Sequence, residues 1–311
     1  MMNEVTSIET EHEPDAEDLS PLPDDRIGAF SSYSLAADLL KLHEIYAGYI
    51  ERIPPDAWIR RTERRAAGWT LLETLAHLDA IATIFNLSIE QALAHQPIQI
   101  AGFTTRHDLR ALNRKAIDER MMLGYNVLSE SFLDSLRYTA RLASALSYSQ
   151  LATTVEHPYF SGRPTIAELV GTSLVHAGMV HGSQLAVGTR MQPIWNFYDP
   201  GMMRRQLTRA FHMVGLAYWP ERGGTLHATL VFQIDGQGGG RWFVRIDPSG
   251  GEGRLGTVRT ADVTLTFASA DLLCRVVTMQ TEIWPLFLLR KLHIRGNPIL
   301  ATRMSRLFIL T

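Results

Sequence analysis

Three histidines in predicted helices are candidates for chemistry in this chain, because an imidazole ring can bind a metal ion or transfer a proton. His77 lies in AHLD, and His176 and His181 lie in VHAGMVHGSQ, all within stretches that have the apolar periodicity of helices. Imidazole is the commonest metal ligand in proteins, but it is also frequent as a buried, hydrogen-bonded core group. The residue type alone therefore does not distinguish a metal site from buried core histidines, so the spacing of the histidines along the helices has to be considered.

The separation of His176 and His181 by five residues does not suit a regular α-helix. At about 100° per residue their side chains diverge by about 140°, so they would not face one ion. A π-helical turn inserts one residue and restores convergence, and Gly178 between them makes such a distortion feasible. The alternative, which holds for most single histidines on an apolar helix face, is that His77 and His181 are hydrogen-bonded core or inter-helix histidines, with Glu73 one turn away as a partner for His77.

Four predicted helices position these histidines. The first spans Ser34–Ile53, and S/T-x-x-D/E patterns at Thr70, Thr105 and Thr165 mark the starts of the other three. The third helix is expected to break near residues 124–129. The sequence therefore predicts a four-helix bundle over residues 31–187.

The carboxy-terminal part alternates apolar and polar residues as strands do. The alternating runs are TLHATLVFQI (225–234), RWFVRI (241–246) and DVTLTF (262–267). Loops rich in Gly and Asp join them, which favours an antiparallel meander. Two helices follow, near 270–279 and over 283–292, and the second has no polar face, so we expect it to be covered on most sides.

These strands and helices predict an α+β domain, an antiparallel sheet covered by helices, over residues 204–311. The segment before it, 188–203, is rich in aromatic residues and proline rather than polar residues. A flexible linker would be polar. We therefore expect a linker packed against its surroundings and two domains in contact.

The composition is that of a globular protein with a net charge close to zero. The 311 residues are 46% apolar with a net charge of −2, which gives no general attraction to nucleic acid or to an anionic membrane. No apolar run approaches the roughly 18 residues of a transmembrane helix, and no signal-peptide core is evident, so we expect a cytoplasmic protein. Residues 1–30 hold nine acidic residues against Arg26 and predict a disordered acidic arm. The single cysteine, Cys274, has apolar neighbours and is expected to be a buried structural thiol.

The last third of the chain contains, in order, LHATLVFQI, RWFVRI, ADVTLTFASADLL and FLLRKLHIRGNPILATRMSRLF. This ordered series resembles the sterol carrier protein type-2 domain. The resemblance implies a hydrophobic tunnel that holds a lipid or another apolar molecule. The residues expected to line it are Leu230, Phe232, Trp242, Val244, Phe267, Trp284, Phe287 and Leu288. Where the family usually has a small residue before the KL step, this chain has Arg290.

The predicted bundle contains GWTLLETLAHLDA (68–80) and TIAELVGTSLVHAGMVHGSQL (165–185). Both segments resemble the DinB-like bundles, which include the thiol-dependent maleylpyruvate isomerases. The resemblance implies a low-molecular-weight thiol and a divalent metal, zinc or nickel, held by a histidine of the second helix and by two ligands four residues apart on the fourth. His77 and His181 match the first and last of these positions, the middle position is Ala177, and His176 or Glu73 are the candidates for a third ligand.

Two functions follow from these patterns. The first is a soluble binding protein whose carboxy-terminal domain takes up a lipid or another apolar small molecule, driven by apolar burial. The alternative is an isomerase or transferase in which a metal-activated thiol attacks the substrate. Binding ranks first at this point because its motif is the more complete in the sequence. The sequence contains no signal for the oligomeric state or for the identity of the ligand, substrate or thiol.

Overall fold

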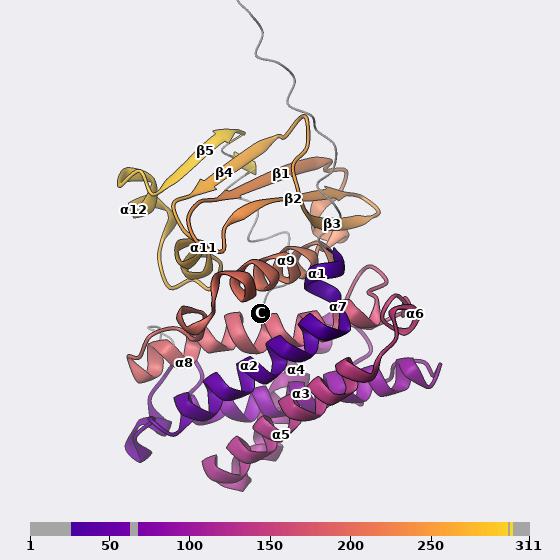
Figure 1. Cartoon of the computed structure of the whole chain (residues 1–311), viewed down its shortest axis with the longest axis vertical. Coiled ribbons are helices and arrows are strands. Elements are labelled where there is room, and N and C mark those ends of the chain that lie inside the picture. The colour runs from indigo at the N-terminus through magenta and orange to yellow at the C-terminus, as the bar shows by residue number, and fades with distance from the viewer. Residues whose placement is uncertain (1–25, 63–67, 298, 301–311) are drawn as a thin grey trace, which may run out of the picture.

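The computed structural model describes residues 26–62, 68–297 and 299–300 of the chain. Figure 1 shows a helical bundle on one side, a β-sheet on the other, and helix α9 (Pro200–Leu216) between them. Most of the acidic arm expected over residues 1–30 lies outside the described residues, and Arg26–Phe30 forms the short helix α1. The expected combination of a four-helix bundle with an α+β domain is confirmed.

The bundle consists of four long helices, the last of which is built from three consecutive segments. Their bounds are α2 Ser32–Ile50, α3 Leu71–Leu93, α5 Gly124–Ala145, and α7 Ile166–Val175 followed by the π-helical segment His176–His181 and α8 Gly182–Thr189. The shorter elements between them are η1 Pro55–Ile59, η2 Arg106–Asp108, α4 Leu109–Arg120, η3 Met121–Leu123 and α6 Tyr148–Leu151. Gly124 has a φ of 74°, a conformation that favours glycine, and it separates α4 from α5 where the sequence predicts a break.

Capping boxes begin helices at two of the three positions where the sequence predicts a helix start, whereas Thr105 precedes the short helix η2. At α3 the Glu73 amide donates to the Thr70 hydroxyl at 3.1 Å, and the Thr70 amide donates to the Glu73 carboxylate at 2.9 Å. Thr165 and Glu168 form the same reciprocal pair at α7. Each such cap stabilises its helix by about 1 kcal/mol. The caps fix where α3 and α7 begin, and therefore the level at which their histidines lie.

The sheet has five strands in the order β3-β2-β1-β4-β5. Their bounds are β1 Ala228–Ile234, β2 Gly240–Asp247, β3 Gly250–Leu255, β4 Val263–Phe267 and β5 Leu292–Gly296. Neighbouring strands are antiparallel except β1 and β4, which pair in parallel with Leu230 opposite Val263. The sheet is therefore mixed, and the expected purely antiparallel meander is wrong at the β1–β4 pair.

Strand β3 occupies the glycine-rich segment that the sequence predicts as a hairpin loop. A Cβ atom at Gly253 would overlap the backbone oxygen of Phe211, and one at Gly215 would overlap the backbone of Gly253. Glycine in a strand commonly marks such a close approach of two backbones. These glycines therefore allow α9 to lie directly on the edge of the sheet.

The apolar face of the sheet packs against α9 and α11 (Ala270–Val277). The Phe211 ring of α9 lies 4.7 Å from the Phe232 ring and 5.3 Å from the Trp242 ring, measured between centroids. The Trp242 indole nitrogen donates to the Thr208 hydroxyl at 3.1 Å. The strand alternation expected from the sequence thus identifies the buried face correctly.

A buried ion-pair cluster joins α9 to the bundle. The Asp38 carboxylate of α2 accepts hydrogen bonds from Arg205 at 2.5 and 2.8 Å and from Arg209 at 2.6 Å. In the segment before α9, the helix η5 (Ile194–Phe197) places Trp195 in the core, where its indole nitrogen donates to Asp271 at 2.9 Å. The bundle and the sheet are therefore held together by specific polar contacts as well as by apolar packing.

The helix α12 (Ile283–Leu288) differs from its prediction. The sequence predicts a helix covered on most sides, but only Leu286 is buried, whereas Trp284 is 68% and Leu288 79% exposed. The remaining short helix, α10 (Pro220–Gly223), precedes β1. Among the described residues, no helix is long and apolar enough to cross a membrane.

Candidate metal centre

The π-helical segment between α7 and α8 turns His176 and His181 to the same side. Gly178 lies inside this segment, and a Cβ atom there would overlap the Tyr198 hydroxyl. The Tyr46 hydroxyl of α2 donates to the Ala177 carbonyl at 2.7 Å. The Gly182 amide also donates to this carbonyl, as the i to i+5 bond of a π-helix, so the Tyr46 hydroxyl is a second donor that holds the widened turn in place. The distortion that the sequence makes feasible is present.

Three imidazole nitrogens converge at this point. His77 Nε2 lies 3.2 Å from His176 Nε2, which lies 3.0 Å from His181 Nε2. Among the described residues, this trio has the ligand atoms and spacing that could hold a metal ion, with all ligand atoms within 4.8 Å of one another. In a tetrahedral zinc site with Zn–N bonds of about 2.05 Å, neighbouring ligand nitrogens are about 3.3 Å apart. The observed spacings are close to that value.

The surroundings of the rings favour the tautomer that a metal requires. His181 Nδ1 lies 2.6 Å from the Gln184 side-chain oxygen. Because that oxygen only accepts, Nδ1 carries the proton and Nε2 keeps its lone pair for the cluster. His77 Nδ1 is buried and has no hydrogen-bond partner among the described residues, so only His181 has its tautomer fixed by a neighbouring side chain.

The close approach of the three Nε2 atoms is better explained by a bound metal ion than by hydrogen bonds among the rings. His176 Nε2 lies near both neighbours but could donate only one proton, so at least one contact between lone pairs would stay uncompensated. A divalent cation at the centre would compensate all three lone pairs. The donor set therefore fits zinc or nickel, since imidazole suits both metals.

Burial keeps the three imidazoles neutral. It lowers the pKa of His77 well below the usual histidine value, and the neighbouring rings of His181 and His176 lower it further. It also lowers the pKa of His176 well below the usual value and that of His181 to about 4, against a small opposing effect of the Gln184 hydrogen bond. Metal binding at neutral pH would therefore require no loss of a proton from these rings.

Aromatic rings cover the cluster. The Trp69 ring is stacked on His181 at 5.9 Å and tilted against His77 at 4.6 Å between centroids, and Phe85 meets His176 edge-on at 6.3 Å. These rings make the site apolar and limit the access of water. Sequence reasoning missed Trp69, Phe85 and Gln184, although Gln184 lies three residues after His181, a spacing that brings helical side chains together.

Two other residues considered from the sequence lie outside the cluster. Glu73 caps α3 and forms an ion pair with Arg114 at 3.1 Å, so of the two candidates for the third position His176 is the one beside His77 and His181. Cys274 is fully buried in α11, and burial raises the pKa of its thiol. That thiol is therefore suited to packing rather than to nucleophilic attack.

A narrow enclosed crevice lies next to His176. Its lining is mostly apolar, with room for about one water-sized molecule as the side chains stand. The lining residues are Leu78, Ile81, Ala82, Phe85, Phe132, Leu136, Thr139, Ser173, His176 and Ala177. A molecule bound next to the three histidines would contact these residues.

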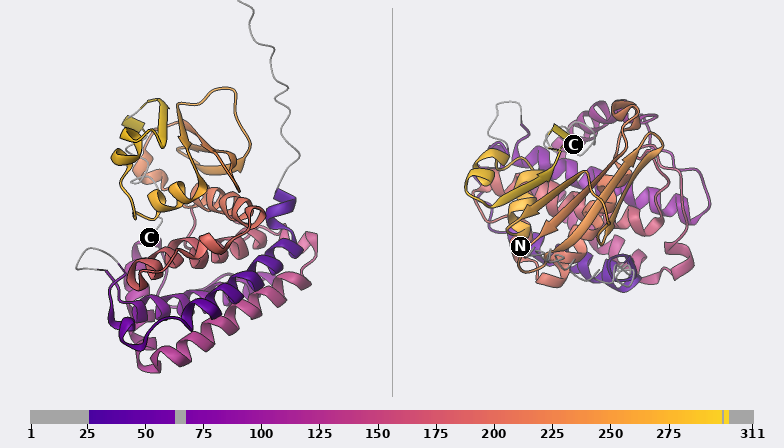
Figure 2. Two further views of the ribbon diagram at one scale, coloured as in Figure 1. Left: turned by 60° about the vertical axis from the view of Figure 1, so that its left-hand side comes forward. Right: turned by 90° about the horizontal axis from the view of Figure 1, so that it is seen from above.

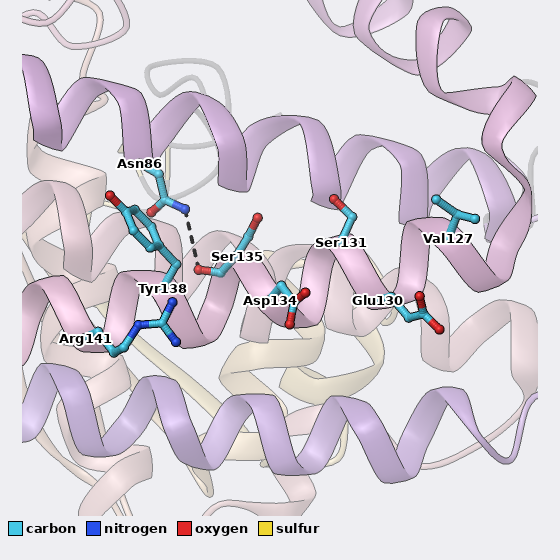
Figure 3. A pocket seen from close by; sticks show the side chains of 8 residues that line it. All are labelled: Asn86, Val127, Glu130, Ser131, Asp134, Ser135, Tyr138 and Arg141. Atoms are coloured by element: carbon cyan, nitrogen blue, oxygen red, sulfur yellow. Dashed lines mark hydrogen bonds between the residues drawn. The ribbon is translucent and has the colours of Figure 1, made fainter.

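A wide groove opens on the outer face of the bundle beside this crevice. Figure 3 shows its lining residues along α5, with Asn86 reaching in from α3, and the groove encloses about 650 Å³. The Thr139 hydroxyl donates to the Asn86 side-chain oxygen at 2.6 Å, and Thr139 also lines the crevice. The Asn86–Thr139 pair thus lies between the open groove and the crevice at His176.

The residues expected to line an apolar tunnel fall into two groups. Leu230, Phe232, Trp242, Val244 and Phe267 lie together on the buried face of the sheet. Trp284, Phe287 and Leu288 lie apart from them on exposed α12. A ligand-binding role for either group stays a prediction.

Comparison with known proteins agrees with both parts of this description. Residues 220–309 match the SCP-2 sterol transfer family, and no curated protein matches the chain. Sterol carrier protein 2 from Yarrowia lipolytica, in its apo form, is 25% identical over 26% of this chain with a TM-score of 0.22, and this chain spans 65% of its length.

A solved structure that matches parts of both the bundle and the carboxy-terminal domain is that of the mycothiol-dependent maleylpyruvate isomerase. It is 11% identical over 78% of this chain and 87% of that chain, with a TM-score of 0.51, and a mutant of the same isomerase matches at 10% identity with the same coverage and score. At this identity the likeness concerns the fold. The chain thus joins a four-helix bundle, which shares its fold with this isomerase, to a carboxy-terminal segment that matches the SCP-2 sterol transfer family.

Proposed function

We propose that this chain is a metal-dependent enzyme that acts together with a low-molecular-weight thiol, with a divalent ion held by His77, His176 and His181. The observation that carries the proposal is the convergence of three neutral Nε2 atoms with neighbour spacings of 3.0 and 3.2 Å. Three protein ligands with a further position open are typical of catalytic rather than structural zinc sites. The enzyme therefore ranks above the binding protein, because His176 completes the ligand set that the sequence leaves open.

We include a thiol in the proposal because this chain shares its fold with a thiol-dependent isomerase. The structurally similar isomerase is mycothiol-dependent, and fold alone does not transfer chemistry, so this part requires its own test. A bound divalent ion would lower the pKa of a coordinated thiol or water and so make a nucleophile available near neutral pH. A cytoplasmic location fits this proposal, since low-molecular-weight thiols are kept reduced there.

The chain's own residues would prepare the site in three ways. Gln184 holds the proton of His181 on Nδ1 and fixes the orientation of that ring. Trp69 and Phe85 cover the imidazoles and exclude water, which strengthens every electrostatic interaction within the site. The crevice at His176 would receive a small, mostly apolar part of the substrate.

A cobalt-substituted protein tests the metal and the thiol together. Metal-free protein reconstituted with Co²⁺ is expected to show the visible absorption of a low-coordinate cobalt site, and addition of a small thiol is expected to add a near-ultraviolet sulfur-to-cobalt band. A cobalt spectrum that does not change with cysteine, glutathione or mycothiol would remove the thiol from the proposal but keep the metal. The absence of any protein-bound cobalt spectrum would remove both.

The role of Gln184 gives a finer test of the same site. Replacing it with alanine should weaken metal binding about 10- to 100-fold, because it removes the acceptor that orients His181. Gln184→Glu keeps an acceptor at this position and should retain binding. Equal affinities for wild type and Gln184→Ala would mean that His181 does not need this partner.

Binding of a lipid or another apolar small molecule by the carboxy-terminal domain is the second candidate function. The match of residues 220–309 to the SCP-2 sterol transfer family supports it. Displacement of a fluorescent fatty acid, with Phe287→Ala compared against wild type, measures such binding. An affinity unchanged by Phe287→Ala would exclude this residue from the ligand site, and no uptake of the probe would count against the function.

A further inference from the structure

An exposed apolar patch lies at the far end of the carboxy-terminal domain. We define the α12 patch as the five large apolar side chains between residues 279 and 289 that are at least 45% exposed. They are Met279, Trp284, Phe287, Leu288 and Leu289. Each of them is at least 45% exposed, and the Trp284 and Phe287 rings lie edge to face at 6.2 Å between centroids.

The position of the α12 patch sets it apart from the core. Figures 1 and 2 show α12 beside β5, which is the edge strand opposite β3. From α12 itself, only Leu286 turns inward to the core of the domain. Contiguous exposed apolar surface of this kind marks an interaction site more often than chance.

The charges around the patch have one prevailing sign. Arg290 and Lys291 follow it directly, and Arg295 lies on the adjacent strand β5; all three are exposed. From residue 279 to 296 the only acidic residue in the sequence is Glu282. The patch therefore combines apolar side chains with a local excess of positive charge, although the chain as a whole carries a net charge of −2.

We propose that the α12 patch docks on an anionic lipid surface. Tryptophan, phenylalanine and leucine insert at the boundary between headgroups and acyl chains, while adjacent arginine and lysine attract anionic headgroups. Two copies of this patch facing each other would place like charges together, which disfavours a homodimer through this face. The proposal stands independently of the metal centre, because the patch belongs to the other domain.

Vesicle flotation with the full chain tests this proposal. Vesicles of phosphatidylcholine with one third phosphatidylglycerol are expected to carry the protein, and pure phosphatidylcholine vesicles are expected to carry far less. Trp284→Ala with Leu288→Ala should weaken the partitioning by roughly tenfold or more, because two exposed apolar anchors are lost. Arg290→Gln with Lys291→Gln should weaken it by roughly fivefold per charge at low salt.

A matched control removes exposed apolar side chains elsewhere. Ile59→Ala with Tyr148→Ala changes two residues of the bundle that are 78% and 79% exposed, and it should leave flotation unchanged. Loss of flotation in this control to the same extent as in the α12 variant would overturn the proposal. So would a full chain that floats with neither vesicle, or a concentration-dependent dimer in sedimentation velocity that only the α12 variant abolishes.

Discussion

Replacement of His176 by alanine is the perturbation that separates a metal centre from a cluster of core histidines. This residue contacts both other imidazoles, at 3.0 and 3.2 Å, and lies in the π-helical segment. A four-ligand zinc site binds with about 10–16 kcal/mol, which is roughly 3–4 kcal/mol for each ligand. Loss of one ligand should therefore weaken zinc binding by about two to three orders of magnitude.

The assay is competition for Zn²⁺ between chelator-stripped protein and a chromophoric chelator at pH 7.5. His157→Ala is the matched control, since His157 is buried, packs against Phe85 as His176 does, at 6.4 Å between ring centroids, and lies outside the cluster. Both variants should lose about 1–2 kcal/mol of unfolding free energy through lost packing. Only His176→Ala should lose metal affinity.

Two results would refute this reasoning. If His176→Ala binds zinc within about threefold of wild type, His176 is not a ligand. If His157→Ala loses affinity to the same extent as His176→Ala, the loss reflects a general loosening of the bundle rather than a missing ligand. Circular dichroism of both variants establishes that each retains its helices.

Three further predictions concern stability. In metal-free protein, burial lowers the pKa of both His157 and His181 from 6.5 to about 4. Between these two pH values the unfolded chain therefore binds more protons than the folded chain. The free energy of unfolding, measured by urea denaturation, should fall by up to about 3 kcal/mol per residue as the pH is lowered from 6.5 to 4. Gly253→Ala should destabilise the protein by about 3 kcal/mol or more, because its Cβ would overlap the backbone of α9, whereas Gly250→Ala meets no atom within 4 Å and should change little. Asp38→Ala should cost about 3–5 kcal/mol because it leaves a buried arginine of α9 without its carboxylate, and a loss below about 1 kcal/mol would mean that this cluster does not hold the two domains together.

Local signals in the sequence account for much of the bundle. The patterns at Thr70 and Thr165 predict helix starts because a hydroxyl and a carboxylate three residues apart satisfy orphan amides, and both caps are present. The break at Gly124 has a different local cause, because a φ of 74° is a conformation that glycine adopts without strain. Alternation along β1, β2 and β4 likewise identifies the face that packs against α9.

The features that could not be predicted depend on tertiary contacts. The π-helical segment is stabilised where Tyr46 of α2 reaches the Ala177 carbonyl, a contact between residues 131 positions apart in the chain. The glycines of β3 are typical of a turn, and only the close contact with α9 explains their presence in a strand. Arg290 has a φ of 56°, a left-handed conformation that glycine adopts more readily than arginine.

The exposure of α12 also differs from the prediction, but for another reason. Its composition predicts burial, because a helix without a polar face is normally covered on most sides. The structure instead places four of the patch side chains outside the core of the domain. Here the apolar pattern marks a surface rather than an interior, and no local signal distinguishes the two.

The metal content of the protein tests the central claim most directly. Wild type purified without chelators or a metal-binding tag is expected to carry one divalent ion per chain by inductively coupled plasma mass spectrometry, and His77→Ala is expected to carry almost none. The account is contradicted if wild type stays metal-free after dialysis against excess Zn²⁺ and Ni²⁺, or if His77→Ala retains the metal content of wild type.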